Sequence, residues 1–318
     1  MKKFKLVFII FSLFALSACT QTYPSKNLEY TELAHSYIKL DTISIPQKYT
    51  PYDFISLDSD TLIATDCEND CLLIIDKETG EIKTEGSTGN DKENYLNPHG
   101  IWLINDFIYV MDSGNMRIKI LDTELKYQKD ININNNTLAY SHGFLNDISV
   151  DKFGNIFFTV YSPREKEAKL YYIENGTNEP KVLINKFMGI VTSYEDKTYC
   201  ANIYEFQKNE DKEYAISGEH YIYEIENLEI TSSYKLPNKY TPAALYTDGG
   251  ELYCSSLAYR EVSKVDLNEM KVIPLFSEIV EFDETVEEVK NYGSLIYDNE
   301  SWWLVETNHN VIYRLQEE

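Results

Sequence analysis

The chain has 318 residues, of which 52 are acidic and 29 are basic, so its formal net charge at pH 7 is −23. This length is ample for one large domain and requires no second one. Phosphate recognition needs a basic surface, so an excess of acidic residues this large excludes nucleic acid as a partner.

The first 18 residues have the features of a secretory signal peptide. Three lysines lie within the first five residues, and the apolar run 6–15 is too short to cross a bilayer as a helix. The next residues, Leu16-Ser17-Ala18-Cys19, resemble a bacterial lipobox, in which cleavage precedes the cysteine and lipid is attached to it. We predict a lipoprotein signal peptide over 1–18 and lipidation of Cys19, which would attach the protein to a membrane. A plain secretory peptide cut near Ala18 is the alternative.

The segment after the signal peptide is polar at first and then strand-like. Residues 19–29 are predicted to be a tether, because 20–26 read TQTYPSK. Residues 37–45 alternate between apolar and polar side chains, which predicts a β-strand.

The clearest structural unit lies between residues 94 and 133. Strands are predicted at 100–104, 107–111, 117–121 and 127–133, with a tight reversal at Asn105-Asp106, since asparagine tolerates the positive φ of such turns. In the third strand Ile118 and Ile120 alternate with Arg117 and Lys119. This period-2 pattern predicts a four-stranded antiparallel sheet with one buried face.

The same unit recurs along the rest of the chain. Copies are predicted at 52–85, 147–184, 188–236, 242–276 and 292–318. A repeat of roughly 40–50 residues built from short strands is typical of propeller blades. We therefore predict an all-β fold, a six-bladed β-propeller of four-stranded antiparallel blades over residues 30–318. The last copy supplies only three strands, so the strand at 37–45 is predicted to complete it and close the ring.

Part of the best-formed unit resembles a known repeat. The segments 98–101 (PHGI), 108–112 (IYVMD) and 115–118 (NMRI) resemble an NHL repeat, and the chain after the signal peptide is similar to six-bladed, TolB-like β-propeller lipoproteins of bacteria. This resemblance, with Thr20 rather than aspartate after Cys19, implies the outer membrane, and we expect its periplasmic face rather than the cell surface. Some six-bladed relatives are enzymes, namely calcium-dependent lactonases and lyases that carry calcium and zinc.

Two cysteines flank a predicted turn in the first blade. Cys67 and Cys71 are separated by three residues, and the predicted compartment permits disulfides, so we predict a disulfide between them. A zinc site is disfavoured because no second pair of ligands is present. The acidic residues of 66–70 lack the glycine and distal glutamate of a calcium loop. Cys200 and Cys254 occupy the same slot of adjacent blades and are predicted to be buried without a disulfide.

The residues at the entries of the first strands are predicted to converge at one mouth of the central channel. They are Asp53, His99, Asp147, Gly189, Ala243 and Gly293, and His142 lies in a connection near the same mouth. We take Asp53, His99, His142 and Asp147 as ligand-binding candidates, since ligands occupy concavities with a few convergent polar groups. The structural alternative is that these residues only form the turns that cap the channel.

No catalytic motif or metal-ligand spacing is present, so no cofactor, metal or catalytic residue is predicted. The insertions at 201–217 and 277–291 are expected to be surface elaborations. The leading hypothesis is a non-enzymatic, lipid-anchored envelope protein that binds a peptide, protein or glycan. The alternative is a calcium- or zinc-dependent lactonase-like or lyase-like enzyme that uses His99, His142 and Asp147 at the channel mouth.

Overall fold

The structure is a computed structural model. It describes residues 25–31, 38–133, 144–162, 167–204, 219–238, 240–256, 261–277, 292–306 and 311–317. The signal peptide with Cys19, the connection with His142, and most of the two insertions lie outside the described residues.

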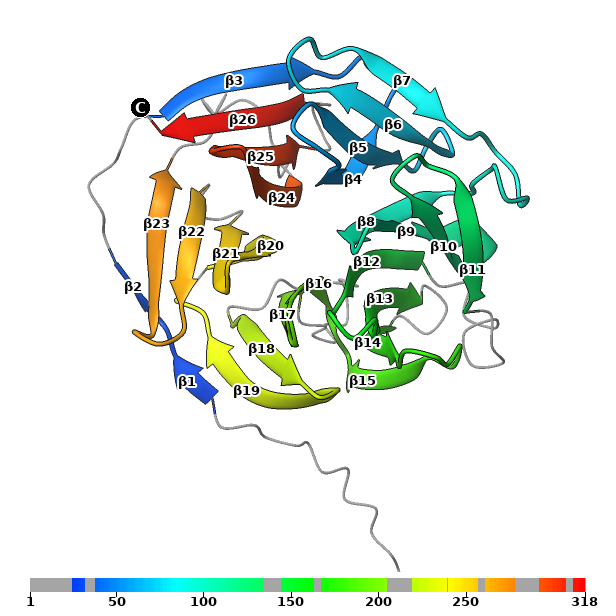
Figure 1. The fold of residues 1–318 in the computed structure, drawn as a ribbon. Coiled ribbons are helices and arrows are strands. Elements are labelled where there is room, and N and C mark those ends of the chain that lie inside the picture. The colour runs from blue at the N-terminus through cyan, green and yellow to red at the C-terminus, as the bar shows by residue number, and fades with distance from the viewer. Residues whose placement is uncertain are drawn as a thin grey trace, which may run out of the picture.

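Six small sheets surround a central axis, and each sheet is one blade (Figure 1). Blade 1 comprises β4 (Pro51–Ser56), β5 (Thr61–Asp66), β6 (Cys71–Asp76) and β7 (Ile82–Glu85). Blade 2 comprises β8 (Pro98–Ile104), β9 (Phe107–Asp112), β10 (Arg117–Asp122) and β11 (Tyr127–Asn132), with the short 3₁₀ helix η1 (Ser113–Asn115) between β9 and β10. Blade 3 comprises β12 (Phe144–Val150), β13 (Ile156–Ser162), β14 (Glu167–Ile173) and β15 (Lys181–Asn185).

The remaining three blades repeat this order. Blade 4 comprises β16 (Met188–Tyr194), β17 (Lys197–Tyr204), β18 (Tyr221–Glu226) and β19 (Glu229–Lys235). Blade 5 comprises β20 (Pro242–Asp248), β21 (Glu251–Ser256), β22 (Glu261–Asp266) and β23 (Lys271–Ser277). Blade 6 comprises β24 (Tyr292–Asp298), β25 (Ser301–Glu306), β26 (Val311–Glu317) and β3 (Ile38–Ser44). The first strand of each blade contacts the first strand of the next, and β24 contacts β4, so the ring is closed. The predicted fold is confirmed.

The ring closes as the sequence predicts. Strand β3 pairs antiparallel with β26, from Ser44 opposite Val311 to Ile38 opposite Glu317. The N-terminal strand therefore supplies the outer strand of the last blade, which the C-terminal repeat lacks.

The predicted tether is wrong in its second half. Strand β1 (Ser25–Asn27) pairs parallel with β19 of blade 4, and β2 (Glu29–Tyr30) pairs parallel with β23 of blade 5. The Tyr30 hydroxyl also donates to Glu261 Oε2 at 2.7 Å. Strands β1, β2 and β3 thus follow the outer edge of blades 4, 5 and 6 in succession (Figure 1), and we call them the N-terminal belt.

The hydrophobic core lies between the blades. Each junction of neighbouring blades has its own cluster of buried side chains, for example around Phe158 between blades 2 and 3 and around Trp303 between blades 6 and 1. Cys200 and Cys254 are fully buried in two of these clusters, as predicted. Among the described residues, no helix is long and apolar enough to cross a membrane.

The predicted disulfide is not formed, because Cys67 and Cys71 are both free. Cys71 pairs with Asp66 across the hairpin, and its side chain packs into the cluster between blades 6 and 1. The turn is stabilised instead by the Asp66 carboxylate, which accepts the main-chain N–H groups of Glu68 and Asn69 at 3.2 and 3.1 Å.

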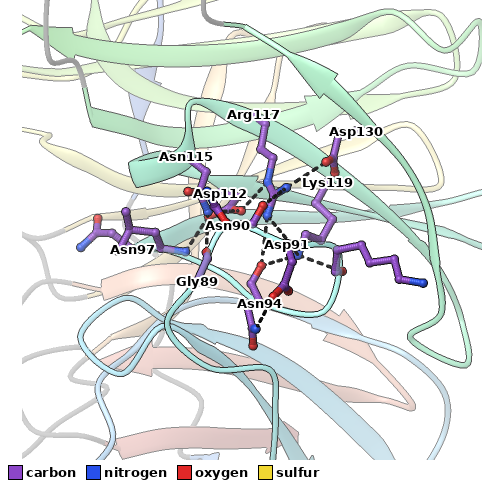
Figure 2. Close-up of polar contacts among 12 residues, drawn as sticks. Gly89, Asn90, Asp91, Asn94, Asn97, Asp112, Asn115, Arg117, Lys119 and Asp130 are labelled. Atoms are coloured by element: carbon purple, nitrogen blue, oxygen red, sulfur yellow. Dashed lines mark hydrogen bonds and ion pairs between the residues drawn. The ribbon is translucent and has the colours of Figure 1, made fainter.

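The loop 86–97 between blades 1 and 2 is bound to β10 by a guanidinium (Figure 2). Arg117 donates to the main-chain oxygens of Asn90, Asp91 and Asn94 at 3.0, 2.8 and 3.1 Å. It also forms ion pairs at 2.6 and 2.9 Å with the carboxylates of Asp112 and Asp130, respectively. The charged residues of the NHL-like segment therefore hold a loop in place.

An ammonium group supports the same loop. The Lys119 Nζ donates to the main-chain oxygen of Lys92 at 3.1 Å and lies 3.9 Å from the centre of the Tyr95 ring. Arg117 and Lys119 are 7% and 0% exposed. The alternation in β10 predicts one buried face, but the loop covers the polar face as well, so both faces are buried.

Candidate functional site

A cavity of about 600 Å³ lies on the central axis of the ring. All six innermost strands line it, and they are β4, β8, β12, β16, β20 and β24. Its walls combine apolar side chains such as Ile148 and Leu295 with a few polar ones. A volume of this size and such a lining are typical of small-ligand sites.

The cavity opens at the turns that join the first and second strands of the blades, and we call this side the hairpin face. The lining continues into exposed residues of these turns, among them Ser59, Asn105, Lys152 and Glu195. The opposite end of the lining consists of less accessible residues, such as the buried Asp53.

The sequence predicts the ligand site at the opposite face, where the chain enters the first strands, whereas the cavity lining extends from beside those entries to the hairpin face. The pairing register shifts at the entry of every first strand, for example between Pro98 and Ile101 in β8 and between Leu145 and Ile148 in β12. Such bulges bend a strand and redirect its side chains. The cavity accordingly begins beside or beyond these bulges.

Asp53 and Asp147 are the two predicted site residues that line the cavity. The Asp53 carboxylate accepts the N–H of Phe54 through Oδ1 and the N–H of Ile101, in the next blade, through Oδ2, both at 2.8 Å. A side-chain hydrogen bond also joins it to Ser294 of blade 6. Asp53 therefore links three blades at the deep end of the cavity.

Asp147 repeats this arrangement two blades further on. Its Oδ1 accepts the N–H of Ile148 at 2.9 Å, and its Oδ2 accepts the N–H of Val191 in blade 4 at 2.7 Å. In both blades a threonine of the second strand, Thr65 or Thr159, accepts the N–H of the aspartate at 3.2 Å. The two sites are equivalent by repeat symmetry.

The two carboxylates influence each other electrostatically. Burial raises the pKa of Asp53 to about 6, against the opposing effect of its hydrogen bonds with Ser294, Ile101 and Phe54. Burial and then the charge of Asp53 raise the pKa of Asp147 well above its usual range. No cation of the described residues contributes to either shift, so the deep end favours one negative charge over two.

His99 does not line the cavity. Its Nδ1 lies 3.0 Å from the main-chain oxygen of Asn97, and its ring meets Tyr52 edge-on at 4.6 Å between centroids. Burial lowers the pKa of His99, which favours the neutral imidazole. Within the described ranges, no three His, Cys, Asp or Glu side chains are grouped as a metal site would require. Gly189 and Ala243 do not line the cavity either, although their neighbours Ile190 and Ala244 do.

Aromatic side chains at the opening were not predicted as site residues. Trp102, Tyr194, Tyr246 and Tyr297 line the cavity towards the hairpin face. Tyr194 and Tyr297 are 37% and 36% exposed, and the Tyr246 hydroxyl donates to the main-chain oxygen of Tyr297 at 2.9 Å. The signal was present in the sequence, since both exposed tyrosines directly precede an acidic residue at the end of a first strand.

Six blades around one central cavity define the chain as a six-bladed β-propeller. The sequence matches no protein-family model and no curated protein. The structure is similar to virginiamycin B lyase from Staphylococcus aureus, with a TM-score of 0.57 and 13% identity over 88% of this chain and 99% of that chain.

Two further solved structures are also similar. A protein of unknown function from Bacteroides thetaiotaomicron has a TM-score of 0.61 and 10% identity, over 89% of this chain and 76% of that chain. A luciferin-regenerating enzyme has a TM-score of 0.59 and 13% identity, over 88% of this chain and 95% of that chain. At such low identity these likenesses show the fold alone.

Proposed function

We propose that this chain is a lipid-anchored protein of the bacterial envelope whose propeller binds a ligand in its central cavity. The ligand is a small molecule or part of a peptide, protein or glycan, and the anchor is the lipid on Cys19. The observation that carries the binding role is the cavity, which combines apolar walls, two carboxylates at its deep end and aromatic side chains at its opening. The lipobox-like segment supports the anchor, and Thr20 supports the outer membrane, with the periplasmic face favoured.

Binding is tested by obstructing the cavity. Leu103→Trp enlarges a half-buried lining residue, and Ser59→Trp places an indole at the exposed rim. In titrations with peptide, oligosaccharide and small-molecule panels, both variants should lose the binding that the unmodified protein shows. Val182→Trp, on the outer strand of blade 3 and 41% exposed before substitution, is the matched control and should retain it. Binding that survives in both blocked variants places the ligand elsewhere.

The anchor is tested separately in cells. Radiolabelled palmitate should enter the protein and should fail to enter Cys19→Ala, which should be released from the membrane fraction. An unlabelled parent protein would contradict the lipid anchor and leave the cavity proposal intact.

An enzymatic role is the second candidate, because two neighbouring carboxylates with raised pKa values can serve as acid and base. The calcium- or zinc-dependent version, with His99, His142 and Asp147, has less support. His99 does not line the cavity, and His142 lies outside the described residues. Stoichiometric calcium or zinc retained after dialysis would favour the enzyme over the binding module.

A further inference from the structure

The charge of the cavity lining is strongly one-sided. Its carboxylates are Asp53, Asp58, Asp147, Glu195 and Asp298, whereas Lys152 is its one basic side chain among the described residues. Two of the carboxylates near the opening have lysine partners, since Glu195 lies 3.2 Å from Lys152 and Asp298 pairs with the buried Lys77. The deep carboxylates, Asp53 and Asp147, have hydrogen-bond donors, and no described cation contributes to their pKa values.

A second, independent feature of the cavity is its aromatic opening. Trp102, Tyr194, Tyr246 and Tyr297 belong to the lining towards the hairpin face, and Trp102 and Tyr246 also pack against the clusters between blades. Aromatic faces attract cations and also pack against methylene groups.

The position of the deep carboxylates limits the shape of the ligand. Asp53 precedes the last residue of β4, Ser56, by three positions, which corresponds to roughly 10 Å along a strand. A group that reaches Asp53 from the hairpin face must therefore be about this long.

We propose that the cavity binds an elongated organic cation, a protonated amine or a guanidinium, with its charge at Asp53 and Asp147 and its apolar part beside the aromatic side chains. This inference rests on the proposed binding function. The cation is carried either by a free small molecule or by a side chain of a peptide.

The alternative explanation of the two aspartates is purely structural, because each one joins neighbouring blades through the N–H of Ile101 or Val191. In that role each carboxylate oxygen accepts one hydrogen bond from a main-chain N–H group, and each oxygen can accept a second hydrogen bond. It does not account for the aromatic residues of the lining. The two explanations are separable by experiment.

The class of ligand is tested with three probes of equal length. 1,5-Diaminopentane, 1,5-pentanediol and glutarate carry cationic, neutral and anionic ends on one carbon chain. Isothermal titration should show binding of the diamine that weakens as salt is added, and at least tenfold weaker binding of the diol and the diacid. A capped Gly-Lys-Gly peptide forms a second arm, and preferential binding of this peptide would assign the cation to a peptide side chain.

Proton release gives an independent readout. The pKa of Asp147 responds to the charge of Asp53. The pKa of Asp53 responds to its hydrogen bonds with the Ser294 side chain and with the N–H groups of Ile101 and Phe54. A cation stabilises the ionised form of both carboxylates, so at pH 6 binding should release a proton. Titrations in buffers with different ionisation enthalpies measure this release.

Variants separate the ligand role from the structural one. Asp147→Asn should weaken diamine binding at least tenfold, and thermal melting shows whether the fold is kept. Asp58→Asn, at an exposed turn, should weaken it two- to threefold without changing the melting temperature. Glu269→Gln, in the β22–β23 turn outside the cavity lining, is the control and should bind normally.

Equal binding of diamine and diol, or preferential binding of the diacid, would overturn the cation assignment. A second outcome is that no cation binds, whereas a neutral glycan binds and Leu103→Trp abolishes its binding. The proposed binding function would then stand, and the inference of a cationic ligand would fail. If no probe or panel member binds, both fail.

Discussion

The Asp53 carboxylate accepts the main-chain N–H of Ile101 at 2.8 Å across the boundary between blades 1 and 2. Asp147 and Val191 repeat this hydrogen bond between blades 3 and 4 at 2.7 Å. A hydrogen bond to a charged acceptor is stronger than one between neutral groups, but a buried charge is costly without a cation. The same two residues therefore join blades and leave negative charge at the deep end of a cavity.

This arrangement predicts an unusual dependence of stability on pH. The pKa of Asp53 is raised from 3.8 to about 6 in the folded protein, so the folded state binds its proton more tightly than the unfolded state does. The stability that Asp53 contributes is then greatest below about pH 4 and is lost as the pH rises through about 6, the reverse of an ion-paired aspartate. Relative to Asp53→Asn, the parent protein should lose about 2–3 kcal/mol of unfolding free energy between pH 4 and 7.

Denaturant unfolding of both proteins at several pH values measures this difference. A difference that stays constant across the range would mean that Asp53 titrates normally, and the electrostatic description of the cavity would be wrong. Glu124→Gln, an exposed carboxylate in the β10–β11 turn, is the control and should follow the parent protein at every pH.

The fold was predictable because its signals are local. Period-2 alternation within short strands and turn residues between them define each blade, and Asn105 and Asp106 have the positive φ values, 49° and 64°, that the tight reversal requires. The closing strand was predictable by counting, since the last repeat lacks one strand. The blades are therefore predicted from residues close in sequence, and the closing strand is predicted from the number of strands in each repeat.

The site was predictable only in part, because its details depend on contacts between distant segments. His99 lies within the bulge at the entry of β8 and does not line the cavity. No residue pattern in 98–101 predicts this bulge. The parallel strand Ser25–Asn27 is polar and exposed at all three residues, so it has no alternation to detect. The burial of Lys119 depends on a loop more than twenty residues away, so a pattern within β10 could not reveal it.

Arg117 is predicted to be a main source of stability in blade 2. The substitution Arg117→Ala leaves the Asp112 carboxylate without its cation, and this carboxylate is 0% exposed. It also leaves three main-chain oxygens of the loop without the guanidinium donor. Loss of one partner from such a buried pair costs about 3–5 kcal/mol of unfolding free energy. Denaturant unfolding should show this loss, whereas Lys129→Ala, on the exposed edge strand β11, should stay within about 0.5 kcal/mol of the parent. An effect of Arg117→Ala as small as the control would show that the loop is held by other contacts.

The N-terminal belt should contribute to stability in two separable steps. Deletion of residues 1–30 removes β1 and β2 and the buried Leu28, but leaves all six four-stranded blades. It should lower the melting temperature while unfolding stays cooperative. Deletion of residues 1–46 also removes β3, which exposes the edge of β26 and opens the ring, so cooperative unfolding should be lost. Cooperative melting of the shorter protein would refute closure by β3 as a requirement of the fold.

The last prediction concerns Gly189, at the bulged entry of β16. A Cβ at this position would lie 2.0 Å from the main-chain oxygen of Ala201 and 2.7 Å from Cζ of Phe187. The first contact is with the backbone of the paired strand β17, which cannot move without breaking the ladder, so Gly189→Ala should cost about 2–3 kcal/mol of unfolding free energy. Gly176→Ala separates this steric effect from backbone strain, because Gly176 has φ +81° but a Cβ there would meet no heavy atom within 4 Å. It should cost about 1 kcal/mol, and equal losses in the two variants would mean that strand pairing at Gly189 yields to the added methyl group.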